Sequence, residues 1–174
     1  MKALVLTPGT RWSKGLDAVM SQLEKYGYAV DCKSRAARGA WDLAVSWGEP
    51  GAPAPRAPLE INPPEAVLRS LSPAEAALHL AWHGIPVSWD LAPPGIARPV
   101  QRFVASEFAS MRVHVADLAV LKVEDDCGGR VAGRLSRWRY QRVLEAACRS
   151  VYVLGLHFGC VHVNVHPSGS WHVE

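Results

Sequence analysis

The chain ends with a strand–turn–strand pattern, GCVHVNVHPSGSWHVE (residues 159–174). Before the turn, valines alternate with polar side chains, and this period of two is typical of a β-strand with one buried face. The PSGS segment (167–170) supplies the Pro, Ser and Gly that favour a tight turn, so WHVE (171–174) is expected to return as a second strand. The polar residues on the alternating positions of this predicted hairpin are His162, Asn164, His166, His172 and Glu174.

This polar face has the chemistry of a metal site, but it also fits a solvated surface. Asn and Glu oxygens suit a hard cation such as magnesium, whereas imidazole suits zinc or another transition metal. The alternative is a solvated hairpin in a protein that contains seven histidines. The hairpin by itself favours that alternative, so the choice depends on the sequence around it.

The residues before the hairpin predict a helix and a further pair of strands. RWRYQRVLEAACRSVYVLG (137–155) has apolar residues at the spacing of an amphipathic helix, with Val143, Ala147 and Val151 among them. SMRVHVADLAVLKV (110–123) alternates like a strand and predicts an antiparallel pair with a turn at Ala116–Asp117.

Three basic side chains in the second of these segments form a candidate anion site. Arg112 and His114 alternate along its first predicted strand, and Lys122 projects from the next. Arg as a bidentate fork and Lys as a point charge could hold phosphate or carboxylate oxygens. Basic residues on an ordinary edge strand are the alternative, and the pattern alone favours it.

The N-terminal part of the chain alternates strand-like and helix-like segments. Buried-strand patterns at 2–7, 28–32 and 41–47 surround an amphipathic helix, which predicts a parallel sheet with helices against it. After a proline-rich connector at 48–58, residues 61–84 predict one or two helices. We therefore expect an α/β fold, with an N-terminal parallel βαβ unit followed by a small antiparallel sheet with a packed helix.

Composition excludes several classes of protein. An apolar fraction of 49% argues against disorder, and a net charge of +3 is too small to imply nucleic-acid binding. The four cysteines form no CxxC pair, so zinc-ribbon and redox motifs have no support. No apolar run is long enough for a membrane span, which predicts a soluble, cytoplasmic protein. The arginine-rich stretch at 130–142 fits a solvated helix start better than a nucleic-acid surface.

The order of these segments resembles the ATP-grasp superfamily. The stretches that carry the resemblance are LEINPPEAVLRSLSPAEAALHLAWHGIPVSW (59–89), RFVASEFASMRVHVADLAVLKV (102–123) and RVLEAACRSVYVLGLHFGCVHVNVHPSGSWHVE (142–174). The third is the most specific, because it resembles the final helix and the metal-bearing hairpin of that superfamily. The resemblance implies a ligase that joins a carboxylate to an amine through an acyl phosphate, with ATP and Mg²⁺ as cofactors.

The resemblance also implies roles for individual residues. Arg112 matches a strand arginine that contacts phosphate or substrate carboxylate, and it is the candidate catalytic residue; Lys122 lies near a second basic position. Asn164 stands where the first acidic metal ligand is expected, and Glu174 matches the metal-binding glutamate. The second-rank candidates are His162 for the nucleotide and His166 for the metal.

The resemblance divides the chain into a Rossmann-like, pre-ATP-grasp-like domain at 1–98 and a reduced ATP-grasp-like subdomain at 99–174. Only DLAPPGIARPVQ (90–101), which contains no lysine, stands where the superfamily has a subdomain with phosphate-binding lysines. We therefore expect a minimal or degenerate ligase with a small-molecule carboxylate or peptide as substrate, and a homo-oligomer that covers the exposed surface. The alternative is a nucleic-acid-binding or assembly protein on the same scaffold.

Overall fold

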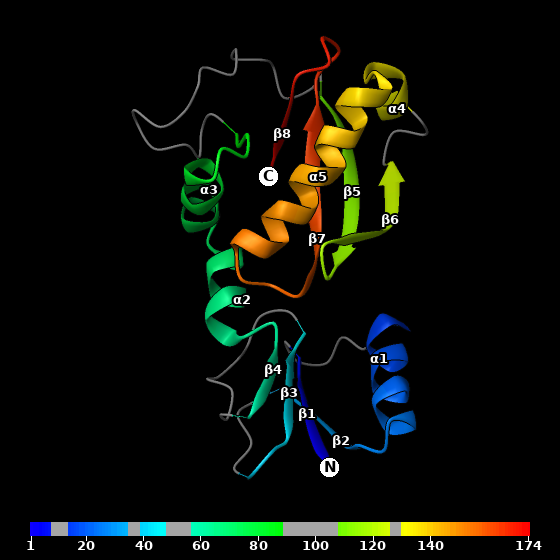
Figure 1. The fold of residues 1–174 in the computed structure, drawn as a ribbon, viewed down its shortest axis with the longest axis vertical. Coiled ribbons are helices and arrows are strands. Elements are labelled where there is room, and N and C mark those ends of the chain that lie inside the picture. The colour runs from blue at the N-terminus through cyan, green and yellow to red at the C-terminus, as the bar shows by residue number, and fades with distance from the viewer. Residues whose placement is uncertain (8–13, 35–38, 48–56, 89–107, 126–129) are drawn as a thin grey trace. The chain divides into compact units, whose positions relative to one another are not determined.

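The chain forms two compact units, Met1–Leu71 and Ser72–Glu174, each with its own four-stranded sheet (Figure 1). The computed structural model describes residues 1–7, 14–34, 39–47, 57–88, 108–125 and 130–174. Within these ranges, no helix has both the length and the apolar character that a membrane crossing requires.

The first unit is built on a parallel sheet. Its elements are β1 (Lys2–Leu6), α1 (Lys14–Lys25), β2 (Ala29–Lys33), β3 (Leu43–Ser46), β4 (Leu59–Ile61) and α2 (Pro64–Leu71). The strand order is β2-β1-β3-β4, and every pairing is parallel. The central strand β1 is buried from Ala3 to Leu6, as its apolar run predicts for a strand with neighbours on both sides. The predicted N-terminal βαβ unit is confirmed.

The segment at 61–84 contains two helices, α2 and α3 (Pro73–Trp82). The break falls at Pro73, which lacks an N–H group and would clash with a preceding helical turn. Ser72 caps the new helix, and its hydroxyl accepts a hydrogen bond from the Glu75 N–H at 3.4 Å. Strand β4 was not predicted, because its three residues are too few to show a period and Leu59 is exposed.

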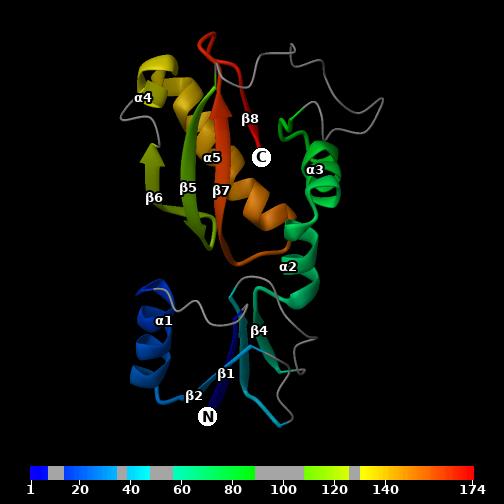
Figure 2. The same cartoon turned by 180° about the vertical axis from the view of Figure 1, so that it is seen from behind.

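The second unit is built on an antiparallel sheet with a long helix packed across it. Besides α3, its elements are β5 (Ala109–Ala116), β6 (Ala119–Asp125), α4 (Arg130–Arg134), α5 (Arg137–Val153), β7 (Phe158–Val165) and β8 (Trp171–Val173). The strand order is β6-β5-β7-β8, with every pairing antiparallel. Figures 1 and 2 show α5 covering one face of this sheet. The predicted small sheet with a packed helix is confirmed.

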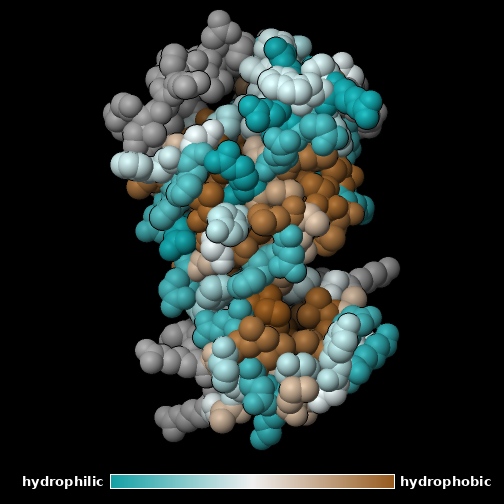
Figure 3. All heavy atoms as spheres, viewed as in Figure 1, coloured by the Kyte–Doolittle hydropathy of each residue, from teal (hydrophilic) through white to brown (hydrophobic). Residues whose placement is uncertain are grey.

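The alternation seen in the sequence sorts side chains between the two faces of this sheet. Met111 pairs with Val163 and Val113 with Val161, and all four are buried on the α5 side. From α5, the buried residues that join this core are Val143, Ala146, Ala147 and Val151. The outer surface of α5, which faces the viewer in Figure 3, is mostly hydrophilic.

The turn between β5 and β6 consists of Asp117 and Leu118, with φ angles of 46° and 64°. Two consecutive positive φ angles are typical of the type I′ turns that suit the twist of a hairpin. The turn therefore lies one residue later than predicted, because Ala116 still pairs with Ala119 in the ladder.

Residues 72–88 pack within the second unit. Val87 forms a parallel bridge with Val173, and the Val173 N–H donates to the Pro86 carbonyl at 2.8 Å. Leu80 and Ile85 join the same core as Met111. The predicted domain boundary at 98/99 lies outside the described residues and stays a prediction.

Candidate functional site

Helix α5 leaves one face of the antiparallel sheet uncovered (Figure 2). The alternating burial of β5 places its polar side chains on that face, away from the core. The strand register arranges them in rows across the sheet. Arg112 lies opposite both Glu124 and His162, and Asn164 lies opposite His172. The neighbouring rows place His114 opposite Lys122 and Cys160, and Ser110 opposite Asn164. Candidate residues that lie far apart in the sequence thus share one surface.

The terminal hairpin brings Asn164 and Glu174 into direct contact. Asn164 Nδ2 donates a hydrogen bond to Glu174 Oε2 at 2.7 Å, and it lies 3.4 Å from His172 Nε2. The chain positions this pair because the Glu174 N–H donates to the His162 carbonyl, which continues the ladder past β8. Asn164 Oδ1 and Glu174 Oε1 make no hydrogen bond with any described residue.

These two oxygens fit a magnesium ion in their chemistry. Mg²⁺ in proteins takes one or two protein oxygen ligands and completes its shell with water and substrate phosphate. No three His, Cys, Asp or Glu side chains within the described ranges are grouped so as to hold a metal ion.

The two histidines beside this pair are buried against an aromatic ring. Phe108 packs edge-on against His172, with ring centroids 4.9 Å apart, and against His166, at 5.5 Å. Burial lowers the pKa of His172, and the nearby Glu174 carboxylate partly offsets that effect. His172 is therefore favoured in its neutral form, with its Nδ1 buried and making no hydrogen bond within the described part of the chain.

His166 occupies a position that shapes the turn of the hairpin. Its Nδ1 lies 2.9 Å from the Ser168 hydroxyl and accepts a hydrogen bond from the Ser168 N–H at 3.1 Å. Arg134 and Arg139 also support this turn, since they donate to the carbonyls of Val165 and Ser168. Two arginines of the basic stretch thus bind backbone oxygens, and the role of His166 as a metal ligand stays a prediction.

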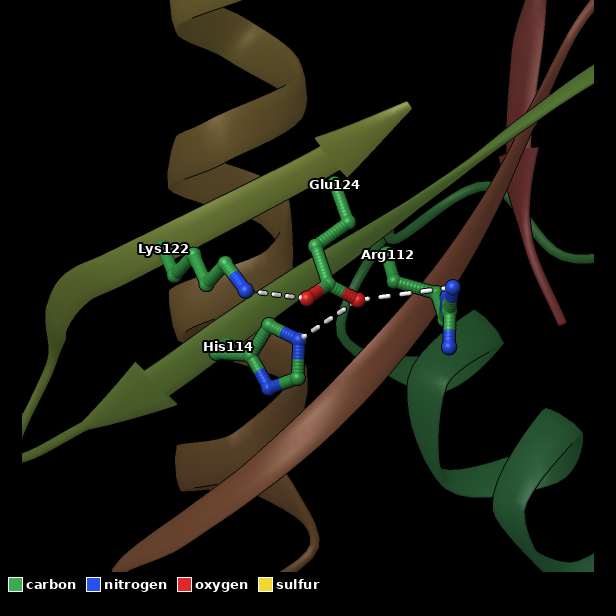
Figure 4. Close-up of polar contacts among 4 residues, drawn as sticks. All are labelled: Arg112, His114, Lys122 and Glu124. Carbon is green, nitrogen blue, oxygen red and sulfur yellow. Dashed lines mark hydrogen bonds and ion pairs between the residues drawn. The ribbon is translucent and has the colours of Figure 1, made fainter. Parts of the chain in front are cut away.

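Arg112 and His114 of β5 and Lys122 of β6 converge on one carboxylate, Glu124 (Figure 4). Glu124 Oε1 accepts a hydrogen bond from Lys122 Nζ at 2.5 Å. Glu124 Oε2 lies 3.4 Å from both Arg112 Nη2 and His114 Nε2. These contacts, with Lys122 the largest cause, lower the pKa of Glu124 to about 2, so it is ionised at neutral pH.

Comparison with solved structures identifies the architecture. The RimK domain ATP-grasp protein from Sphaerobacter thermophilus DSM 20745 is 13% identical over 99% of this chain and 89% of its own, with a TM-score of 0.60. Macrocyclase MdnC from Microcystis aeruginosa MRC, bound with precursor peptide MdnA, is 8% identical over 99% and 91%, with a TM-score of 0.59. The chain has an ATP-grasp-like fold. No protein-family model and no curated protein matches the sequence.

A third structure with this fold contains bound cofactors. ATP-grasp ligase PsnB, complexed with minimal precursor, Mg and ADP, is 12% identical over 99% of this chain and 87% of its own, with a TM-score of 0.55. Sequence identities this low establish the fold alone. The predicted resemblance to the ATP-grasp superfamily is confirmed at the level of the fold.

The sequence pattern alone assigns Glu124 no role in the ATP-grasp-like site. The available signal was the alternation itself, since Lys122 and Glu124 are two residues apart on one strand and must share a face. The assigned roles of Arg112, Lys122, His162, Asn164 and Glu174 stay predictions.

Proposed function

We propose that the protein binds a magnesium–nucleotide complex on the uncovered face of its antiparallel sheet and acts as an ATP-dependent carboxylate–amine ligase. The observation that supports this most is the pair of oxygens from Asn164 and Glu174, on the same sheet face as Arg112. In the proposal these two side chains hold Mg²⁺, and Arg112, Lys122 and His162 contact the phosphates.

The residues of this face have the chemistry that such a ligase needs. Mg²⁺, when bound, neutralises charge on the phosphate oxygens. Arg112 is 41% exposed, so its guanidinium can contact an incoming phosphate or acyl phosphate. Asn164 is neutral where an acid would add charge, so we expect magnesium to bind weakly without nucleotide and more tightly with it.

Peptides are the proposed class of substrate. PsnB and MdnC were solved with precursor peptides, and both share the ATP-grasp-like fold of this chain. A ligase of this kind would activate a side-chain or terminal carboxylate of a peptide and join it to an amine. The cytoplasm, which supplies ATP, is the proposed location, and the free thiols of Cys32, Cys148 and Cys160 would stay reduced there.

A second candidate is a protein that binds the nucleotide without turnover. Among the described residues of this face, Glu174 has no cationic side chain in contact, whereas Glu124 contacts both Arg112 and Lys122. A site with one available acid positions metal and phosphate less firmly than a site with two. This candidate predicts nucleotide binding with no ADP release when peptide is added.

The experiment is a thermal-shift titration with ATP in the presence and absence of Mg²⁺. Ligand at a hundred times its Kd stabilises a protein by about 2.7 kcal/mol, which is readily measured as a rise in Tm. We expect a magnesium-dependent rise for the wild type and a much smaller one for Glu174→Ala. Glu145→Ala, on the exposed surface of α5, is the control that should behave like the wild type. No rise in the wild type would refute the proposal.

A further inference from the structure

We propose that Arg112, His114 and Lys122 form a binding site for the oxyanion of a ligand, and that Glu124 occupies this site as an internal competitor that the ligand must displace. The ligand oxyanion is a phosphate or a carboxylate. This inference rests on the proposed function, because Arg112 and Lys122 are among the residues proposed to contact nucleotide. It adds a regulatory role for Glu124.

The geometry of the cluster is that of a bound carboxylate. Both oxygens of Glu124 are in contact with basic side chains of two adjacent strands: Oε1 with Lys122, and Oε2 with Arg112, while His114 Nε2 lies 3.4 Å from Oε2 without a hydrogen bond (Figure 4). A phosphate or carboxylate of a ligand would need the same N–H groups. The Glu124 carboxylate therefore indicates which class of ligand the cluster can bind, namely an oxyanion. Glu124 and such a ligand would compete for the same donors.

The charges favour exchange for a ligand with more negative charge. Counted over these side chains alone, Arg112 and Lys122 are positive at neutral pH and Glu124 supplies a single negative charge, which is an excess of one positive charge. A phosphate dianion would neutralise that excess. Protonation does not release Glu124 at neutral pH, because its pKa lies at about 2. Release consequently requires a competing anion.

The exposure of the cluster makes such an exchange accessible. The side chains of Arg112 and Lys122 are 41% and 65% exposed, and that of Glu124 is 28% exposed. The Nε2 atom of His114 is itself buried and makes no hydrogen bond within the described part of the chain, so Arg112 and Lys122 are the donors that an incoming anion can reach first. Ion pairs with this much exposure to water contribute little to stability, so breaking them costs little. Glu124 can rotate its carboxylate into solvent without leaving a buried charge behind.

The test is a titration with inorganic phosphate and, separately, with acetate, at constant ionic strength and without magnesium or nucleotide. Binding is followed by NMR through the side-chain signals of Arg112 and His114. Glu124→Gln keeps the size of the side chain and removes its charge, and it is expected to lower the Kd for phosphate about tenfold. Glu145→Gln makes the same change in net charge on the exposed surface of α5 and should leave the Kd unchanged.

A second variant keeps the test independent of how well Glu124→Gln folds. Lys122→Met removes the cation that holds Oε1 and should weaken phosphate binding several-fold. Unchanged or weaker binding in Glu124→Gln would overturn the inference, since Glu124 would then position the cations rather than compete for them. Absence of binding to every protein would overturn it too. Phosphate binding without magnesium–nucleotide binding would refute the proposed function but would still support this oxyanion site.

Discussion

Replacing Asn164 with Asp should make the stability of the second unit depend on magnesium. In the wild type Asn164 Nδ2 donates to Glu174 Oε2 at 2.7 Å. The variant loses this hydrogen bond to a charged acceptor, which in a buried setting contributes about 1.5–3 kcal/mol. It also sets two carboxylates side by side, and charges about 4 Å apart repel by about 1 kcal/mol in bulk water and about 4 kcal/mol near a protein surface.

Because Glu174 is exposed, both effects are reduced, and we expect a net destabilisation of about 2 kcal/mol without metal. For a domain of about 100 residues this corresponds to a fall in Tm of about 10 °C. Magnesium should reverse most of the fall, since two carboxylates and a divalent cation attract one another.

The assay is thermal unfolding by circular dichroism in EDTA and in millimolar MgCl₂. Asn164→Ala is the control, because it loses the hydrogen bond without adding charge and should respond to magnesium no more than the wild type. Equal Tm values for Asn164→Asp and the wild type in EDTA, or no recovery in magnesium, would refute the view that these side chains form a cation site.

Three further predictions concern stability. Gly169→Ala should destabilise the hairpin by about 1–3 kcal/mol in urea unfolding, since the φ of Gly169 is +78° and an added Cβ would lie close to Arg139 Nη1. Gly133→Ala is the control: its added Cβ would meet nothing within 4 Å, so this variant should not be destabilised. The depressed pKa of Glu124 stabilises the fold at neutral pH, and this contribution should disappear as pH falls from 4.5 to about 2, except in Glu124→Gln. Burial lowers the pKa of His172 below 6.5, so stability should fall as pH drops below 6.5, where the unfolded chain takes up the proton first.

The fold was largely predictable because its periodic signals are strong. The alternating valines of the last hairpin and the apolar face of α5 specify which surfaces meet, and Val143, Ala147 and Val163 are buried as expected. Strand β4 was not predicted because its three residues carry no clear strand pattern. It is a strand because it pairs in parallel with β3. Short elements of this kind depend on tertiary contacts that a local pattern does not contain.

The site was predictable as a surface but not as a set of contacts. Alternation places Asn164 and Glu174 among the polar positions of the hairpin, yet it cannot say that Asn164 donates to Glu174 or that Arg112 of another strand shares their face. Nor does it show that Glu124 holds the basic residues, because cross-strand partners depend on register, and register depends on where the turn falls. The turn lies one residue beyond its predicted place, and the bulge after His114 shifts the pairing again.

The most direct test of magnesium–nucleotide binding is to locate the metal. Mn²⁺ accepts the same oxygen ligands as Mg²⁺, and it broadens the NMR signals of nearby nuclei. With Mn²⁺ and a non-hydrolysable ATP analogue, we predict the strongest broadening at the amides of Asn164 and Glu174, and much weaker broadening along α5 on the opposite face of the sheet. Loss of this broadening in Glu174→Ala would support the assignment. Broadening that is strongest elsewhere, or absent, would contradict it.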